Sequence, residues 1–255
     1  MKAVQIIERI EAQRNEEQRQ VLMRFFKTGK GDYGEGDKFL GLKVPQTRTI
    51  VKTVASDTPL NEVPELLQSR WHEVRLCGLL ILVEKFEKAA TKRSINAPQA
   101  IQTRDEIVRM YLNYADRANN WDLVDLSAPK IIGHWLLLPT ALGGGVGMNT
   151  YYKQQVLDEL AECDCLWKQR ISIVCTWKTT QQGELSWCWR YAEKHLRHPH
   201  DLMHKAVGWM LREMGKRDMN LLRQFLKQHA HEMPRTALRY SIEKMPAPER
   251  KAWMS

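Results

Sequence analysis

The sequence predicts an all-α fold in which antiparallel helix pairs stack into an α-solenoid of HEAT-like repeats. Apolar residues recur at helical spacing along almost the whole chain of 255 residues, and no pair of alternating strands is joined by a hairpin turn. Helix pairs recur every ~35–45 residues, a period that is typical of HEAT and armadillo solenoids and implies a long concave surface. A single compact helical bundle is the alternative.

Two short helices are predicted at the start of the chain, on either side of the polar break EAQRNEEQRQ. Their apolar residues fall at helical intervals and are Ile6, Ile7, Ile10, Val21, Leu22 and Phe25. Residues 28–45 are rich in glycine and charge, which predicts a loop. Pro45 suits the first turn of the next helix, because the N–H that proline lacks has no helical partner there.

Further segments of helix length follow, each bounded by turn signals. They cover residues 61–68, 72–90, 97–117, 119–137, 151–162, 166–182, 184–196, 201–218, 219–230 and 234–245. The run ISIVCTW has the propensity of a buried strand, but its helical flanks favour a helix. The glycine-rich residues 139–150 lack the patterns of phosphate-binding loops and predict a flexible connection.

Three segments resemble one another: RWHEVRLCGLLILVEKF, CLWKQRISIVCTWK and DLMHKAVGWMLREMG. In each, a basic residue follows an early apolar residue by three or four positions, and small and branched apolar residues then occupy one face. Their irregular spacing indicates a degenerate internal repeat. We expect residues 1–255 to form a single domain.

The composition favours a polyanionic partner. The net charge is +9, from 39 Lys and Arg against 30 Asp and Glu. No apolar run approaches the roughly 20 residues that span a bilayer, and the N-terminus lacks the features of a signal peptide. We therefore expect a cytoplasmic protein that does not bind membranes.

The five cysteines are odd in number and show no CxxC spacing, which predicts reduced thiols. Cys163 and Cys165 are possible metal ligands, as is a histidine cluster that contains His195, His198, His200 and His204. No matching carboxylate or second cysteine pair accompanies them, so we expect neither a metal nor another cofactor.

The segment 201–218 places aromatic and basic side chains on one helical stripe. The positions i, i+4, i+7 and i+11 are occupied by Lys205, Trp209, Arg212 and Lys216. The opposite stripe should face the core and consists of Met203, Val207, Met210 and Met214. Either the basic side chains simply cover a surface tryptophan through cation–π contacts, or the stripe is a binding face.

Two other predicted helices place chemically active side chains close together. Trp121 and Asp125 are four residues apart in NNWDLVDL and so project from one face. Arg170 stands before an apolar run, with Trp167 three residues earlier on nearly the same face. The alternatives are a half-buried tryptophan beside a solvated aspartate, and an arginine that caps a core helix.

Five strings of the sequence resemble the DNA alkylation repair family, the AlkD-like DNA glycosylases built from HEAT-like repeats. The strings are GDKFLGLKVP, WHEVRLCGLLILVEKFEK, NNWDLVDLSAP, RISIVCTW and HKAVGWMLREMGKRD. The resemblance implies a C-shaped solenoid that holds duplex DNA in its concave groove. It also implies an activity that removes N3- and N7-alkylated purines, which are cationic bases.

The resemblance assigns catalytic roles to Trp121, Asp125, Arg170 and Trp209. Phosphate contacts are expected from Arg48, Lys205, Arg212, Lys216 and Arg217, with Arg235 and Arg239 as further candidates. A cationic purine leaves as a neutral base, so the electron-poor sugar is the species to be stabilised. Asp125 can oppose that charge and orient water, and the resemblance implies that the base need not leave the helical stack.

We therefore predict a monomeric glycosylase that acts on double-stranded DNA with alkylated purines. Two other classes of protein remain open. One is a HEAT-like module that binds damaged or branched DNA without cleaving it. The other is a helical scaffold that uses the Trp209 stripe to bind an acidic protein.

Overall fold

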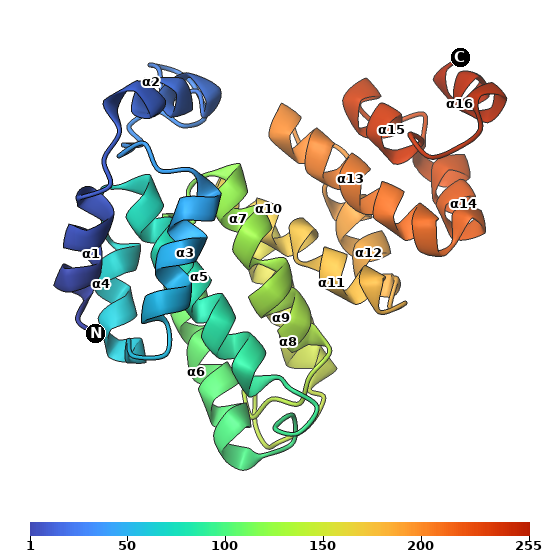
Figure 1. The fold of residues 1–255 in the computed structure, drawn as a ribbon. Helices are drawn as coiled ribbons and strands as arrows, with labels where there is room; N and C mark the ends of the chain where they lie inside the picture. Colours follow the sequence, from blue (N-terminus) through green and yellow to red (C-terminus); the bar gives the residue numbers. More distant parts are fainter. The chain divides into compact units, whose positions relative to one another are not determined.

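The protein folds into helices without any β-strand, which confirms the predicted all-α class. The computed structural model describes residues 1–255 (Figure 1). Its contacts divide the chain into two compact units. Unit 1 comprises Met1–Ile131 and Leu138–Asn149, and unit 2 comprises Ile132–Leu137 and Thr150–Ser255. The assignment of residues 1–255 to one domain stays a prediction.

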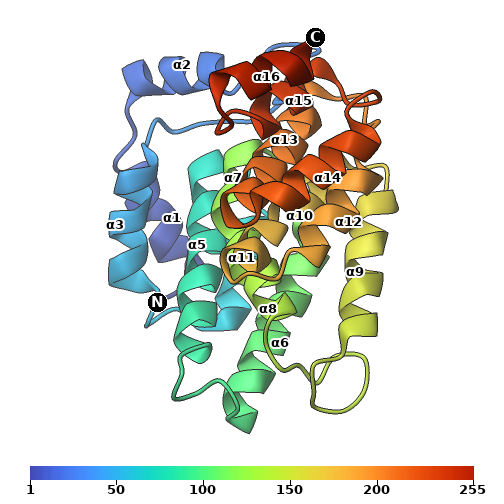
Figure 2. The same cartoon turned by 90° about the vertical axis from the view of Figure 1, so that its right-hand side faces the viewer.

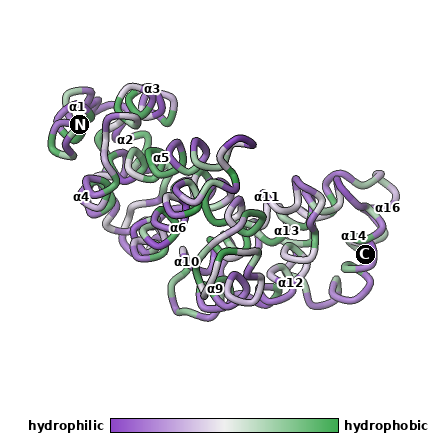
Figure 3. The backbone as a smooth tube through the Cα atoms, turned by 90° about the horizontal axis from the view of Figure 1, so that it is seen from below, coloured by the Kyte–Doolittle hydropathy of each residue, from purple (hydrophilic) through white to green (hydrophobic).

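Unit 1 is built around one buried helix, α5. Its helices are α1 (Ala3–Glu11), α2 (Glu16–Phe25), α3 (Val44–Val54), η1 (Leu60–Glu62), α4 (Val63–Leu67), α5 (His72–Ala89), α6 (Pro98–Asn113), η2 (Ala115–Arg117) and α7 (Trp121–Ser127). Helices α3, α4, α6 and α7 pack against α5 (Figures 1 and 2). Every residue from His72 to Val83 is buried. The string LCGLLILV, residues 76–83, leaves no polar face on its part of the helix. Stretches of α5 accordingly have the hydrophobic colour in Figure 3.

Unit 2 is arranged around α13. Its helices are α8 (His134–Leu136), α9 (Thr150–Glu162), α10 (Leu166–Val174), α11 (Thr176–Gln181), α12 (Ser186–Lys194), α13 (Asp201–Arg217), α14 (Met219–His229), α15 (Arg235–Ser241) and α16 (Ala247–Met254). Helices α10, α11, α12, α14 and α15 pack against α13. The predicted apolar stripe of α13 is confirmed, since Met203, Val207, Met210 and Met214 are all buried. The three similar segments of the sequence form α5, α10 with the start of α11, and α13.

Helix α13 approaches α15 closely at Gly208. A Cβ atom at this position would lie 2.5 Å from the carbonyl oxygen of Ala237 and 2.5 Å from the Cβ of Tyr240. Only a residue without a side chain permits this separation of the two helices.

Several predicted helices end earlier than expected. Residues 119–137 were predicted as one helix, but α7 stops at Ser127 and a π-helical segment, Pro129–Gly133, follows. The cause is Pro129, which lacks an N–H for the α-helical ladder. Residues 166–182 likewise form α10 and α11 with Cys175 between them, and ISIVCTW is helical as predicted. Helix α16 was not predicted.

Of the glycine-rich residues 139–150, which were predicted as a loop, all but Thr150 lie in a loop, with a single bridge between Thr140 and Gly147. Its base is fixed to α6, because the Asp105 carboxylate accepts hydrogen bonds from the Thr140 hydroxyl at 2.5 Å and the Ala141 N–H at 2.7 Å. None of the helices has both the length and the apolar character that crossing a membrane requires.

Three of the five cysteines, Cys77, Cys175 and Cys188, are buried. Burial raises the pKa of the Cys77 thiol to about 12 and has the same effect on Cys188. The pKa of Cys175 is raised as well, again because burial disfavours the thiolate.

The close crossing of α13 and α15 predicts that Gly208→Ala destabilises the protein. The added methyl group must push against backbone, so we expect a loss of ~1–3 kcal/mol. Urea unfolding followed by circular dichroism measures this loss. Gly147→Ala is the matched control, since a Cβ there meets nothing within 4 Å. Equal unfolding midpoints for the two variants would contradict the prediction.

Candidate active site

Helix α7 presents Trp121 and Asp125 on one face, and both line a cavity of about 380 Å³ in unit 1. The helix begins after Asn120, a buried residue whose side-chain oxygen accepts the Trp121 N–H at 2.9 Å. Trp121 and Asp125 are both half-buried. The expected arrangement of ring and carboxylate on a shared face is therefore present within unit 1.

The remaining walls of the cavity are mainly apolar. They come from α2, the loop after it, α3, α5 and α7, and include Leu22, Phe25, Phe26, Phe39, Leu42, Val44, Pro45, Leu76 and Leu126. Phe26 stacks on Trp121 with ring centroids 5.2 Å apart, and on its other neighbour Phe39 at 5.1 Å. Phe25 meets the Trp121 ring edge-on at 5.8 Å and is itself 61% exposed. These contacts fix the plane of the indole ring.

A buried network of charged side chains joins α7 to α5 and to the loop before α3. His72 Nδ1 lies 2.8 Å from Asp37 Oδ2, and His72 Nε2 lies 2.9 Å from Asp122 Oδ2. Arg75 Nη2 donates to the other Asp37 oxygen at 2.6 Å. Since Asp122 directly follows Trp121, the network joins the loop, α5 and the first turn of α7.

His72 is protonated in this network and donates from both ring nitrogens. Burial lowers its pKa, but the carboxylates of Asp122 and Asp37 outweigh burial and raise the pKa to about 9. Burial raises the pKa of Asp37, but His72 and Arg75 outweigh it and lower the pKa to about 2. Two carboxylates thus face two cations inside the protein, and none of the four charges is left without a counter-charge.

Glu73, next to His72, holds the loop that forms one cavity wall. Its buried carboxylate accepts the N–H groups of Leu40 at 2.9 Å, Gly41 at 2.8 Å and Leu42 at 3.1 Å. Gly41 has a φ of +100°, and a Cβ atom there would lie 2.0 Å from the Asn15 carbonyl oxygen. The string GDKFLGLKVP therefore forms, up to the start of α3 at Val44, a loop whose backbone is tied to the start of α5.

Arg170 and Trp209 belong to unit 2. Arg170 is buried on α10, and its Nη1 donates to the Leu202 carbonyl oxygen, in the first turn of α13, at 2.7 Å. Trp209 is half-buried on α13. The convergence of these two residues with Trp121 and Asp125 on one DNA sugar stays a prediction.

Most of the expected phosphate-binding cations have partners within their own unit. Lys205 pairs with Asp201 at 2.7 Å, Lys216 pairs with Glu213 at 2.6 Å, Arg212 pairs with Glu243, and Arg217 donates to Gln181. Arg48 is half-buried on α3. Any contact with phosphate must therefore compete with these partners, and the role of the cations in DNA binding stays a prediction.

The histidine cluster forms hydrogen bonds that link α10 to the residues before α13. His195 Nε2 lies 2.8 Å from the Ser172 hydroxyl, and His198 Nε2 lies 2.8 Å from Gln169 Oε1. His204 Nε2 contacts the His198 carbonyl oxygen at 2.6 Å. Burial lowers the pKa of His195 to about 4, so its ring is neutral at neutral pH. No group of His, Cys, Asp and Glu in the structure is arranged to hold a metal ion.

A family model described as "DNA alkylation repair enzyme" matches residues 6–245. The chain belongs to this family of DNA alkylation repair enzymes. A solved structure, a predicted DNA alkylation repair enzyme from Enterococcus faecalis, is similar to this repair-family chain with a TM-score of 0.65 and 14% sequence identity. The similarity covers 92% of this chain and 98% of that one, and shows that the two share a fold. A search of the curated proteins finds no match.

The buried charged residues that hold the candidate site of this DNA alkylation repair protein in place could not be predicted from the sequence. From the sequence, His72 and Asp122 are only members of predicted helical segments, and Asp37 is only part of a predicted charged loop. Their hydrogen bonds join residues 35 and 50 positions apart. The strings WHEVRL and NNWDLVD contained the one available signal, because each places a polar residue where an apolar helix enters the core.

The charge of His72 predicts a pH dependence of stability in this DNA alkylation repair protein. Because its folded pKa of about 9 lies above the unfolded value of 6.5, its contribution is complete below pH 6.5 and is lost as pH rises through about 9. We expect the thermal midpoint to fall over this interval, and His72→Asn to remove that fall. His195→Asn is the control, since His195 is already neutral there and the fall should persist. A wild-type midpoint that does not change between pH 6.5 and 9 would rule out a charged His72.

Proposed function

We propose that the protein is a DNA glycosylase that excises cationic N3- or N7-alkylated purines from duplex DNA. Its family supports a role in the repair of alkylated DNA. The observation on which the finer proposal rests is that Trp121 and Asp125 line one cavity from a single helix.

In the proposed reaction the bond between C1′ and the purine nitrogen breaks, and its electron pair enters the ring. The ring thereby loses its positive charge and departs as a neutral base. Water then adds to the electron-poor C1′ and gives up a proton, which leaves an abasic site. Because alkylation has already placed the charge on the leaving group, the reaction needs neither a general acid nor a cofactor at the base.

The protein's contribution is electrostatic and is made at the sugar. Asp125 opposes the positive charge that develops on the deoxyribose and accepts a hydrogen bond from the attacking water. The Trp121 face attracts the same charge, a contact that contributes roughly 0.5–2 kcal/mol. Phe26 and the Asp122–His72 contact hold α7 and its ring in place, so little reorganisation is needed when the charge appears.

Arg170 and Trp209 are proposed to act on the same nucleotide from unit 2. The guanidinium of Arg170 is oriented by the Leu202 carbonyl, and its planar set of N–H donors suits a backbone phosphate. This mode of action works on the sugar and the backbone, so the damaged base can remain stacked in the duplex. Neutral lesions such as uracil should be poor substrates, because they require protonation to leave.

Asp125→Asn should abolish most of the release of N7-methylguanine from duplex DNA. The amide keeps the shape of the side chain and removes its charge, so we expect the single-turnover rate to fall ~100–1000-fold. Release of free base is measured by chromatography, and DNA binding by fluorescence anisotropy. The control is Asp116→Asn, which removes one exposed carboxylate from the same unit.

The outcomes of this experiment separate the three classes of protein. Loss of release with binding retained supports the glycosylase. Wild-type binding without any release indicates a non-catalytic DNA-binding module, and no binding of duplex DNA at low salt indicates a protein scaffold. Full release by Asp125→Asn would refute the role of the carboxylate.

Trp121→Leu should lower the same rate by roughly 10-fold, because it removes the aromatic face but keeps an apolar side chain. Trp121→Phe should retain most of the rate, since a ring can still stack on Phe26. The comparison is made at saturating protein in single-turnover reactions. Equal rates for the leucine and phenylalanine variants would show that the ring face does not stabilise the sugar.

A further inference from the structure

Lys43 brings a primary amine to the candidate active site. It directly precedes the first residue of α3 and lines the same cavity as Trp121 and Asp125. No other lysine lines this cavity. The residue is exposed, and none of the ion pairs of unit 1 includes it. The amine can therefore reach a molecule that occupies the cavity.

A fixed stretch of backbone carries Lys43. The Glu73 carboxylate accepts the N–H groups of the three residues before it. The Lys43 N–H donates to Gln46 Oε1 at 2.8 Å in the first turn of α3. From this fixed point a flexible four-carbon stem extends and ends in a compact nitrogen. The position of the residue is thus defined, while its amine can adjust to a reacting carbon.

Most other polar groups of the cavity form the framework of unit 1. His72 contacts two carboxylates, one of which is Asp122, and Glu73 accepts three backbone N–H groups. These groups hold helices and loops together. Lys43 and Asp125 are therefore the candidates for chemistry in the cavity, the first as a nucleophile and the second as a base.

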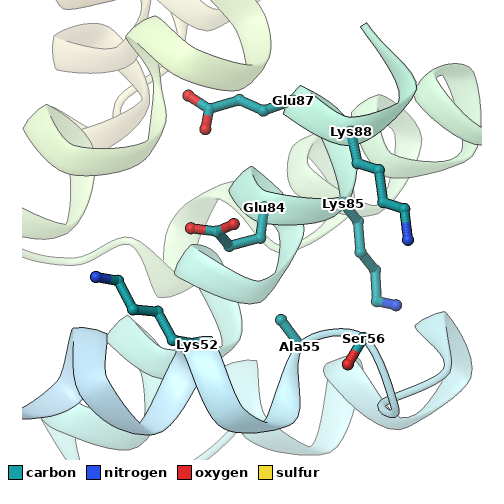
Figure 4. A pocket seen from close by; sticks show the side chains of 7 residues that line it. All are labelled: Lys52, Ala55, Ser56, Glu84, Lys85, Glu87 and Lys88. Atoms are coloured by element: carbon teal, nitrogen blue, oxygen red, sulfur yellow. The ribbon is translucent and has the colours of Figure 1, made fainter. Parts of the chain in front are cut away.

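Other lysines of unit 1 line a separate hollow of about 430 Å³, shown in Figure 4. Its charged lining consists of Lys52, Lys85, Lys88, Glu84 and Glu87. This hollow contains no aromatic side chain and shares no lining residue with the active-site cavity. Lys43 differs from these lysines because it lies in one cavity with Trp121 and Asp125.

We propose that Lys43 gives the protein a second activity, as a lyase that cleaves the DNA strand at an abasic site through a covalent imine. The inference rests on the proposed function, because excision of the base would leave an abasic deoxyribose at this cavity. The ring of such a sugar opens reversibly to an aldehyde at C1′. An aldehyde and a lysine amine combine to form an imine, the intermediate of Schiff-base enzymes.

The proposed reaction needs no oxidant or reductant. The lone pair of the unprotonated Lys43 Nζ forms a bond with C1′, and the aldehyde oxygen leaves as water. The protonated imine withdraws electrons from C2′, whose proton passes to the Asp125 carboxylate. The electron pair left at C2′ forms a double bond with C3′, and the 3′ phosphate departs with the electrons of the C3′–O bond. Water then hydrolyses the imine and restores the amine.

Reductive trapping tests this activity. A duplex with one abasic site, prepared by enzymatic removal of a uracil base, is incubated with the full-length protein and sodium borohydride, which reduces the imine to a stable amine. The adduct is measured on a denaturing gel, and mass spectrometry of its peptides locates the attached residue. We expect the adduct at Lys43, and Lys43→Gln should lower the trapping rate about 100-fold or more.

Two further variants show whether this loss is chemical. Lys43→Arg keeps a cation, but a guanidinium is not deprotonated and forms no imine, so it should lose trapping as Lys43→Gln does. Lys38→Gln removes an exposed lysine of the same loop that does not line the cavity, and it should trap at the wild-type rate. Circular dichroism shows which variants are folded, and the mapped wild-type adduct decides the question for any that are not.

The outcomes separate the lyase from the proposed glycosylase. Release of N7-methylguanine by the wild type without any adduct or strand cleavage rejects the lyase alone. An adduct at another residue, or wild-type trapping by Lys43→Gln, overturns the role of Lys43. An adduct at Lys43 without release of N7-methylguanine retains the lyase and rejects the proposed function.

Discussion

The buried contact of His72 with Asp37 and Asp122 is the interaction on which the candidate site depends. It joins three parts of unit 1 that are distant in the sequence: the loop before α3, the first turn of α5 and the first turn of α7. The neighbouring Glu73 ties the same loop through three backbone N–H groups. Two consecutive residues of α5 therefore set both the wall of the cavity and the position of the helix that presents Trp121 and Asp125.

A buried charged network that joins helices costs desolvation free energy, and apolar side chains of similar volume often stabilise a fold as well or better. The advantage of the charged network is that its hydrogen bonds are directional. A leucine at position 72 could pack in several ways, whereas an imidazolium between two carboxylates has one arrangement in which both N–H groups are satisfied. If the site acts as proposed, with a ring and a carboxylate near one sugar, that geometric definition matters more than the gain in stability.

The sequence predicted well those features that depend on local periodicity. The buried methionine stripe of α13, the loop before Pro45 and the shared face of Trp121 and Asp125 all follow from the spacing of a helix. Where prediction failed, the cause was usually a distant partner. The pairing of Arg212 with Glu243 depends on how α13 packs beside the chain that follows α15, and no local pattern contains that information. The aromatic wall of the cavity likewise needs Phe26 and Trp121, nearly a hundred positions apart, to meet.

The burial of Cys77, Cys175 and Cys188 has a consequence for a protein of this family. Alkylating agents that damage DNA also attack thiols, and they react with the thiolate rather than with the protonated form. Because burial raises the pKa of these three cysteines, almost none of their sulfur is nucleophilic at neutral pH, and the surrounding core excludes the reagent. The interior of the molecule is thus chemically resistant to the electrophiles that create its proposed substrates.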